Sequence, residues 1–165
     1  ESFPDPYEAK REVWIPFIES LGADESTVLV GHSSGAVAAL RYAELHRLKA
    51  VVLVAATYTD LGDPGERASG YYPQQTSAGG KVTNPYDFAA MRANCPTWRQ
   101  FHSNNDCFIP LEEAERIRDG LGLVSEEEYF MLPGRSHFLE PFPELLDAVM
   151  DVLGTPYSTT SQDGS

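Results

Sequence analysis

The stretch TVLVGHSSG, residues Thr27–Gly35, decides the fold of this chain. Thr27–Val30 is apolar or β-branched on both sides of the pleat, as in a strand buried within a parallel sheet. Gly31–Gly35 consists of small and polar residues that suit a tight turn. Ala36–Leu45, rich in Ala, Leu and Arg, then predicts a helix. A strand, a tight turn and a helix in this order indicate a layered α/β fold.

The same alternation continues through the chain. Further buried strands are predicted at Ala50–Ala55, Thr97–Phe101 and Glu128–Leu132. Helices are predicted at Val13–Leu21 (with Pro16 as a kink or a start), Tyr86–Asn94, Leu111–Leu121 and Pro143–Leu153. In the last helix the residues expected on the buried side are Leu145, Leu146, Val149, Met150 and Leu153. We therefore expect a three-layer α/β fold in which helices cover both faces of a parallel sheet.

Two segments fall outside this alternation. Residues from Thr57 to Pro85 are rich in Gly, Pro, Ser and Tyr, which predicts a long irregular excursion, either a lid over a site or a disordered loop. Residues 154–165 are small and polar, which predicts a disordered tail. We therefore expect a single folded domain over residues 1–153.

The composition excludes several classes of protein. The net charge of the 165-residue chain, −13, argues against nucleic acid as a partner, because phosphate contacts need clustered Lys and Arg. The acidic charge is expected to keep the protein soluble or, alternatively, to attract cationic substrates. No apolar run approaches the ~20 residues of a membrane span, so no membrane partner is predicted. Cys95 and Cys107 are too few for a disulfide framework or a zinc site and are expected to be reduced thiols of a cytoplasmic protein.

The turn after the first strand matches the pattern G-x-S-x-G in Gly31-His32-Ser33-Ser34-Gly35, between a predicted strand and a predicted helix. The serine of this pattern occupies a strained turn with its hydroxyl exposed, and the two glycines let strand and helix approach each other. The helix N-terminus directs free N–H groups toward a developing oxyanion. Ser33 is therefore the candidate nucleophile, and the N–H of Ser34 is the candidate oxyanion donor.

Two later loops supply a candidate acid and a candidate base. Asp106 follows the third predicted strand and His137 follows the fourth. Because the carboxyl ends of parallel strands meet at one edge of a sheet, both loops are expected to lie near Ser33. The order serine, acid, histidine along the chain is the one in which G-x-S-x-G serines occur with their partners. Alone, Asp106 would equally suit a polar loop residue or a helix cap.

Elimination among the histidines favours His137 as the base. His32 is next to Ser33, and neighbours on an extended chain point to opposite sides. His46 ends a helix, where a cation is favourable for electrostatic reasons alone. His102 ends a strand and is the rival, but it precedes the candidate acid.

These residues predict a hydrolase of small carboxylic esters or amides. His137 would take the proton of Ser33, Asp106 would orient the imidazole, and an acyl-enzyme would form without a metal or a cofactor. One alternative is a catalytically silent interaction protein on a hydrolase scaffold. A flavodoxin-like nucleotide binder is a third, weaker hypothesis, because no Gly-rich phosphate loop follows a strand.

The chain resembles the retinoblastoma-binding protein 9 family of small serine hydrolases, which have the α/β-hydrolase fold. The similarity extends from about Phe3 to Leu153. The stretches that carry it are Pro4–Pro6, Gly31–Gly35, Tyr42–Arg47, Asp60–Asp63, Glu66–Tyr71, Ala93–Pro96 and Gly134–Phe138. The resemblance implies that Glu66–Tyr71 belongs to the wall of the active site, although Arg67 could equally hold a simple turn.

The chain departs from this family in three places. The resemblance implies a strand beside Thr27–Val30 and a Gly-rich loop with a second oxyanion donor, both upstream of the sequence given. We therefore expect the 165-residue chain alone to be poorly stable and nearly inactive. The retinoblastoma-binding motif of the family, Leu-x-Cys-x-Glu, has no Cys in Leu21–Glu25, so that partner is not predicted. The segment Gln74–Asn84 is longer than the family leads us to expect.

Overall fold

The computed structural model describes residues 2–75 and 81–155. Its main sheet is parallel and has the strand order β1-β2-β5-β6. The strands of this sheet are β1 (Val28–His32), β2 (Ala50–Val54), β5 (Trp98–Ser103) and β6 (Tyr129–Leu132). The helices are α1 (Arg11–Ser20), α2 (Ser34–Ala43), α3 (Pro64–Ser69), α4 (Phe88–Asn94), α5 (Leu111–Leu121) and α6 (Pro143–Leu153). The predicted three-layer α/β fold is confirmed.

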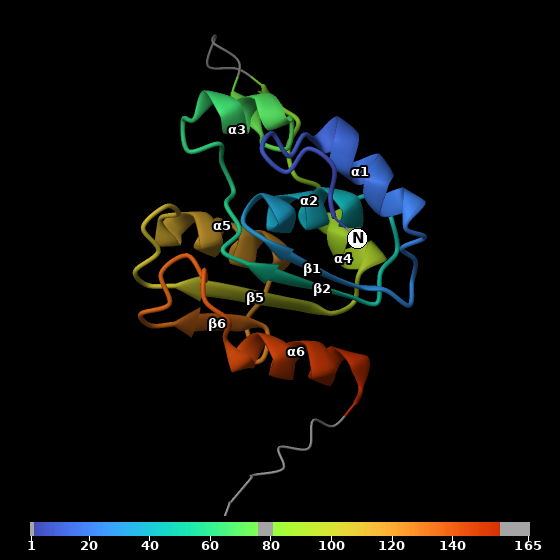
Figure 1. Ribbon diagram of the computed structural model, residues 1–165, viewed down its shortest axis with the longest axis vertical. Coiled ribbons are helices and arrows are strands. Elements are labelled where there is room, and N and C mark those ends of the chain that lie inside the picture. The colour runs from blue at the N-terminus through green and yellow to red at the C-terminus, as the bar shows by residue number, and fades with distance from the viewer. Residues whose placement is uncertain (1, 76–80, 156–165) are drawn as a thin grey trace, which may run out of the picture.

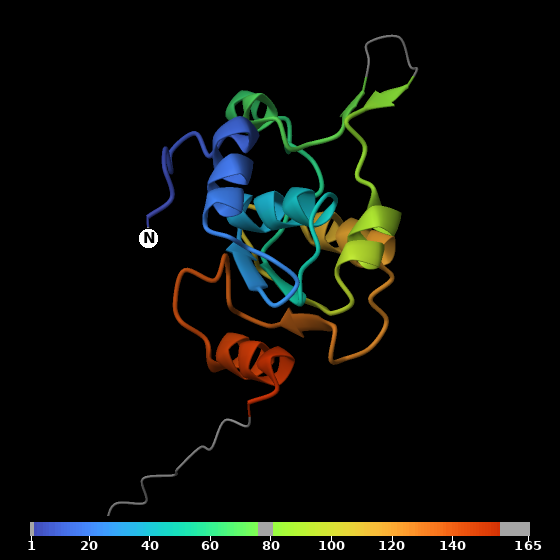
Figure 2. The same ribbon diagram turned by 90° about the vertical axis from the view of Figure 1, so that its right-hand side faces the viewer.

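Helices cover both faces of the sheet, as Figures 1 and 2 show from two sides. α2, α4 and α5 lie on one face, and α6 lies on the other. The residues of β2 alternate between the two cores: Val51 and Leu53 pack with the first group of helices, and Val52 and Val54 pack toward α6. α1 packs on α2 rather than on the sheet.

Two strands that look alike in sequence have different surroundings. Every residue of β2 is buried, because β2 lies between β1 and β5. β1 stands at the end of the strand order, and Val30 in its middle is 44% exposed. Within residues 2–75 and 81–155, no strand pairs with the outer edge of β1. The expectation that Thr27–Val30 is buried like an inner strand is therefore wrong: Val30 is exposed, and the other three residues are only partly buried.

The predicted irregular excursion at Thr57–Pro85 contains regular structure, so that prediction is wrong. α3 lies within it, with the carboxylate of Asp63 accepting a hydrogen bond from the N–H of Glu66 at 2.9 Å. Gly70 ends this helix in the left-handed conformation. Two short strands, β3 (Gln74–Gln75) and β4 (Val82–Thr83), pair in antiparallel fashion. Residues 76–80 of the excursion lie outside the described residues.

Two details of the C-terminal segment also differ from expectation. α6 buries Ala148 most fully, whereas Leu146 and Leu153 are 44% and 43% exposed, so their predicted burial is wrong. Gly154 caps α6 in the left-handed conformation and thus belongs to the fold rather than to a tail. Residues 156–165 of the predicted disordered tail lie outside the described residues.

Every helix in the described ranges is too short or too polar to cross a lipid bilayer.

Candidate active site

The candidate nucleophile occupies a strained turn between β1 and α2. Ser33 has φ 53° and ψ −122°, a conformation that costs a residue with a side chain about 1–3 kcal/mol. The N–H of Ser33 donates to the carbonyl of Val54 on the neighbouring strand at 2.9 Å, which anchors the turn to the sheet. Because Ser34 is the first residue of α2, its N–H has no acceptor within the helix.

The two glycines of the turn are not equivalent. A Cβ added to Gly31 would lie 2.3 Å from the carbonyl oxygen of Gly35, so no side chain fits at residue 31. A Cβ added to Gly35 would meet nothing within 4 Å. The expectation that both positions must be small is therefore correct for Gly31 and wrong for Gly35, where the added carbon would point into open space.

The candidate acid and base are hydrogen-bonded to each other. His137 Nδ1 lies 2.9 Å from Asp106 Oδ2, and the side chain of Asp106 is 0% exposed. The other oxygen of Asp106, Oδ1, accepts from the N–H groups of Phe108 and Ile109 at 2.9 and 3.0 Å. Asp106 therefore stabilises its own turn, as expected of a polar loop residue, and it also contacts the imidazole, as expected of an orienting acid.

Ser33 and His137 line one cavity of about 380 Å³. The other residues that line it are Ser34, Thr57, Leu61, Glu66, Tyr72, Phe108 and Ile109. Among the described residues, Ser33 Oγ makes no hydrogen bond to the His137 ring; such contacts are often long in unliganded sites. The fold therefore brings the predicted serine and histidine to one cavity, and the predicted acid contacts the histidine from outside the cavity lining.

One wall of this cavity comes from α3 and the segment after it. Tyr72 is buried, and its hydroxyl donates to Glu66 Oε2 at 2.7 Å. Burial and this hydrogen bond raise the pKa of Tyr72 above its usual value, so the phenol stays neutral. Glu66 lies in the stretch Glu66–Tyr71 that the family resemblance assigns to the wall of the active site, and it lines the cavity. Arg67 forms an ion pair with Asp60 at 2.6 Å, which agrees with the alternative that Arg67 holds a turn.

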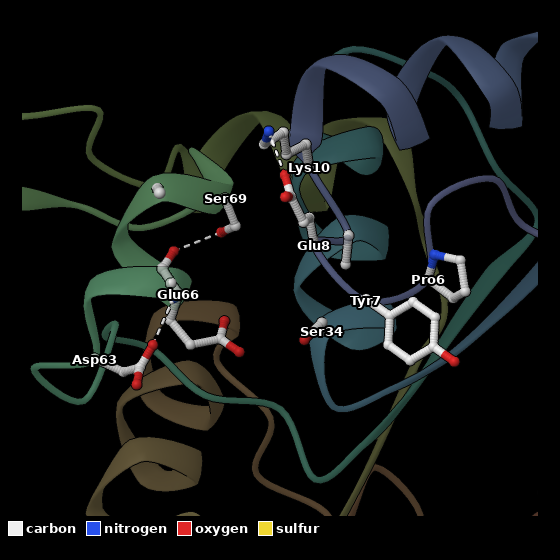
Figure 3. Close-up of a pocket in the computed structure, with 11 residues that line it drawn as sticks. Pro6, Tyr7, Glu8, Lys10, Ser34, Asp63, Glu66 and Ser69 are labelled. Carbon is white, nitrogen blue, oxygen red and sulfur yellow. Dashed lines mark hydrogen bonds and ion pairs between the residues drawn. The ribbon is translucent and has the colours of Figure 1, made fainter.

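A second cavity, of about 420 Å³, adjoins the first, and Ser34 and Glu66 line both. It lies between the N-terminal segment Pro6–Lys10 and α3, as Figure 3 shows, with Ser34 on its floor. Lys10 forms an ion pair with Glu8 at its rim. The space beside the turn therefore continues past Ser34 toward the N-terminal segment.

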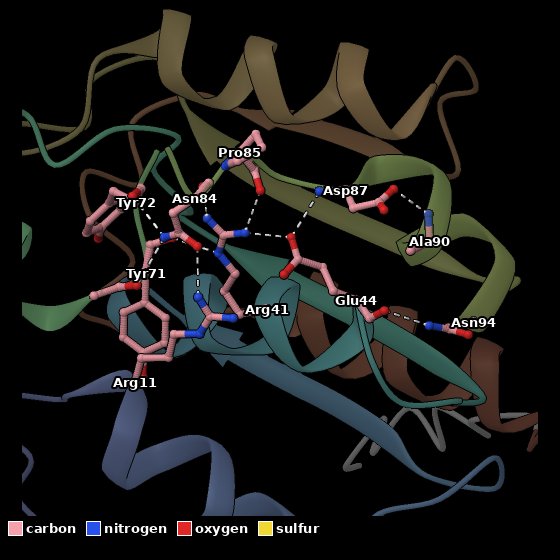
Figure 4. Close-up of polar contacts among 11 residues, drawn as sticks. Arg11, Arg41, Glu44, Tyr71, Tyr72, Asn84, Pro85, Asp87, Ala90 and Asn94 are labelled. Carbon is pink, nitrogen blue, oxygen red and sulfur yellow. Dashed lines mark hydrogen bonds and ion pairs between the residues drawn. The ribbon is translucent and has the colours of Figure 1, made fainter. Parts of the chain in front are cut away.

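A buried arginine on α2 holds the segment that carries Tyr72 (Figure 4). Arg41 is 1% exposed and donates to the carbonyls of Tyr71, Asn84 and Pro85 at 2.7, 2.7 and 3.0 Å. It also pairs with Glu44 at 2.6 Å. The sequence gives no sign of this role, because an Arg in a helix rich in Ala and Leu resembles an exposed residue.

Asn84 completes this network. Its amide Nδ2 donates to the carbonyls of Gly70, Tyr71 and Tyr72, and its Oδ1 accepts from Arg11 at 2.9 Å. Asn84 has φ 53°, and Asn is among the residues that tolerate this conformation best. Both ends of the segment between Gly70 and Pro85 are thus tied to the body of the domain.

The remaining histidines differ partly from expectation. His32 does not line the cavity of Ser33, but it contacts the base candidate: its Nε2 lies 2.8 Å from the carbonyl oxygen of His137, and the two rings lie 4.8 Å apart. Because Ser33 has a strained, non-extended backbone, the side chains of His32 and Ser33 do not alternate between opposite faces as in a regular strand. His102 is fully buried behind the loop of Asp106, and its ring nitrogens have no hydrogen-bond partner in the described part of the chain. Burial lowers the pKa of His102, and partial desolvation lowers the pKa of the more exposed His32.

A strained serine turn between β1 and α2, with an acid and a histidine on loops after later strands of the same parallel sheet, is typical of one class of protein. The family model described as "Alpha/beta hydrolase family" matches residues 1–160. The chain belongs to the α/β hydrolase family. It is 39% identical over 155 residues to a protein of Rattus norvegicus named serine hydrolase RBBP9, an alignment that covers 93% of this chain and 76% of the rat protein. The resemblance inferred from the sequence is thus confirmed, and hydrolase function is supported.

Solved structures of low sequence identity share the fold. The ydeN gene product from B. subtilis superposes with a TM-score of 0.75 at 18% identity, covering 94% of this chain and 81% of that protein. The meta-cleavage product hydrolase from Pseudomonas fluorescens superposes with a TM-score of 0.54 at 14% identity, covering 92% and 73%. At these identities, the similarity supports the fold alone.

Proposed function

We propose that this protein is a serine hydrolase that cleaves small carboxylic esters or amides through an acyl-enzyme on Ser33. The observation that carries the proposal is the hydrogen bond of 2.9 Å between His137 and the buried Asp106, beside a cavity that Ser33 also lines. A buried carboxylate on Nδ1 leaves Nε2 of the imidazole free to accept a proton.

The proposed reaction proceeds in two halves. Ser33 Oγ attacks the substrate carbonyl carbon while His137 Nε2 takes the hydroxyl proton, and Asp106 stabilises the resulting imidazolium. The N–H of Ser34 donates to the oxyanion of the tetrahedral intermediate. The intermediate collapses as His137 returns the proton to the leaving alcohol or amine. Water, activated by the same histidine, then hydrolyses the acyl-enzyme and regenerates Ser33.

The cavity favours compact, uncharged acyl groups. Leu61, Tyr72, Phe108 and Ile109 give it a largely apolar wall. Glu66 adds a carboxylate to the same wall. An acyl group with its own negative charge would be repelled by Glu66, so neutral acyl esters are expected to react faster than esters of dicarboxylic acids.

Covalent labelling with a fluorophosphonate tests this proposal. Ser33 Oγ would bond to phosphorus as fluoride leaves, and because each molecule reacts once, even a slow hydrolase is detected. We expect the folded chain to be labelled and Ser33→Ala to be unlabelled at an unchanged melting temperature. A folded chain that resists labelling, or one that Ser33→Ala leaves equally labelled, would overturn the proposal; the first result would favour the silent interaction module.

A further inference from the structure

We infer that Ser103, Asn104 and Asn105 are positioning residues that hold the base, His137, in place. The inference rests on the proposed function of the site. These three residues directly precede Asp106: Ser103 is the last residue of β5, and Asn104 and Asn105 follow it. We call residues 103–106 the acid loop and residues 134–137 the base loop.

The acid loop binds the base loop residue by residue. Asn104 Oδ1 accepts from the N–H of Gly134 at 3.1 Å, and Ser103 Oγ accepts from the N–H of Arg135 at 3.0 Å. Asn105 Oδ1 accepts from the N–H of Ser136 at 2.9 Å. The fourth member of each loop completes the series, because Asp106 Oδ2 contacts His137 Nδ1. Four consecutive side chains of one loop thus contact four consecutive residues of the other.

The contacts within the acid loop fix which atoms face the base loop. The hydroxyl of Ser103 donates to Asn105 Oδ1 at 2.8 Å, so its lone pairs remain for the N–H of Arg135. Asn105 Oδ1 in turn accepts from both Ser103 and Ser136. Ser103 is 1% exposed, and a buried hydroxyl that is fully hydrogen-bonded strengthens a polar network of this kind.

The base loop needs such support because the backbone is strained on both sides of His137, at Ser136 within the loop and at Phe138 just after it. Gly134, Ser136 and Phe138 have φ of 73°, 48° and 53°. For Ser136 and Phe138, this left-handed conformation costs on the order of 1–2 kcal/mol each. A loop with these conformations would relax if its N–H groups lost their acceptors, and His137 lies between the two strained residues.

The other side of the base loop is held by the nucleophile turn. The carbonyl of His137 accepts from His32 Nε2 at 2.8 Å, and His32 is the residue before Ser33. The backbone of the base loop is therefore fixed at each of its four residues. A displacement of a catalytic group by 1 Å can cost about 10² in rate, so small movements of this loop have large effects on the proposed chemistry.

Asn105→Ala tests the inference, with fluorophosphonate labelling of Ser33 as the readout. The variant removes the acceptor next to the base, and we expect the labelling rate to fall by about tenfold or more. We also expect kcat for a neutral ester to fall more than KM rises. In the proton NMR spectrum, the low-field signal expected for the His137 Nδ1 proton bound to Asp106 should broaden or disappear in the variant. Asn105→Asp keeps an oxygen acceptor for the N–H of Ser136, so it should recover most of the labelling rate.

Asn94→Ala is the matched control. Asn94 also makes two hydrogen bonds, donating to the carbonyls of Ala43 and Glu44, but it lies away from the cavity of Ser33. It should lower the melting temperature and leave the labelling rate unchanged. If Asn105→Ala does not fold, Asn104→Ala replaces it, because that side chain is exposed and makes one contact with the base loop.

The outcomes separate this inference from the proposed function. An unlabelled wild-type chain means that the proposed function fails. A labelled wild type, together with labelling of the folded acid-loop variants at the wild-type rate, overturns the positioning role and leaves the proposed function intact. Equal losses in Asn105→Ala and Asn94→Ala would also overturn it, because the effect would then be one of general stability.

Discussion

The two sides of the candidate site are built differently. On the nucleophile side, Ser33 is held by backbone strain, by close packing at Gly31 and by a hydrogen bond to Val54. On the acid–base side, Asp106 and His137 are held by side-chain hydrogen bonds between two loops. β1, which precedes the candidate nucleophile, ends the described sheet on one side; β5, which precedes the candidate acid, is an inner strand, and β6, which precedes the candidate base, ends the sheet on the other side.

This difference shows that the two sides should respond to different kinds of mutation. Changes of volume should harm the nucleophile side, because a close backbone approach has no room to relax. Loss of polar atoms should harm the acid–base side, because buried polar groups left without partners are costly. Each of the following predictions concerns one of the two sides, and together they test whether the sides respond differently.

The largest effect is expected on the acid–base side from Asp106→Asn. The variant keeps the shape of the side chain but removes the charge that stabilises the imidazolium, so kcat and the labelling rate should fall on the order of 10³-fold or more. The melting temperature should change little, because Oδ1 can still accept from Phe108 and Ile109. Near wild-type rates in a folded Asp106→Asn protein would show that the carboxylate has no part in the reaction.

A large loss of stability is expected on the nucleophile side from Gly31→Ala. Its methyl group would clash with the backbone of Gly35, and the free energy of unfolding should fall by about 3 kcal/mol. Gly35→Ala is the matched comparison, because the added methyl group meets open space and Ala favours the helix by about 0.5–1 kcal/mol. Urea denaturation of both variants measures the contrast, and equal losses would contradict the close approach at Gly31.

The smallest effect concerns His102, buried beneath the acid loop. Burial lowers the pKa of His102 in the folded state, whereas the pKa of a histidine in the unfolded chain is about 6.5. As pH falls below that value, the unfolded chain binds a proton that the folded chain resists, so stability decreases. In His102→Leu, the loss of unfolding free energy between about pH 7 and pH 5 should therefore be smaller than in the wild type. Urea denaturation at both pH values should show this flatter dependence, and parallel pH curves for the two proteins would exclude His102 as the cause.

The nucleophile turn was predictable because its determinants are local. Strand, small residues, serine and helix follow one another within Thr27–Leu45, and the close approach at Gly31 is implied by the pattern itself. The exposure of Val30 was not predictable in this way. Which of several apolar strands ends a sheet depends on their order in space, and the residues of β1 and β2 carry no local sign of it.

The short helix α3 could have been found, because Asp63, Pro64 and Gly70 are the start and stop signals of a helix. Its neighbours Gly62, Gly65 and Pro73 favoured an irregular loop instead. The contacts of the acid loop depend on which loops become neighbours, so their signal was limited to a polar run before Asp106. That Ser33, Asp106 and His137 act together in catalysis stays a prediction, although Ser33 and His137 line one cavity and Asp106 contacts His137.

Arg41 links one wall of the cavity to the helix that follows Ser33. The guanidinium binds the backbone of the segment that bears Tyr72 to α2, the helix that begins at Ser33 and Ser34. Because this link is made to backbone carbonyls, side chains on the wall such as Tyr72 and Leu61 can be replaced without displacing the backbone around Ser33. Single substitutions in the wall are therefore expected to change which acyl groups fit, while Ser33 and His137 keep their positions.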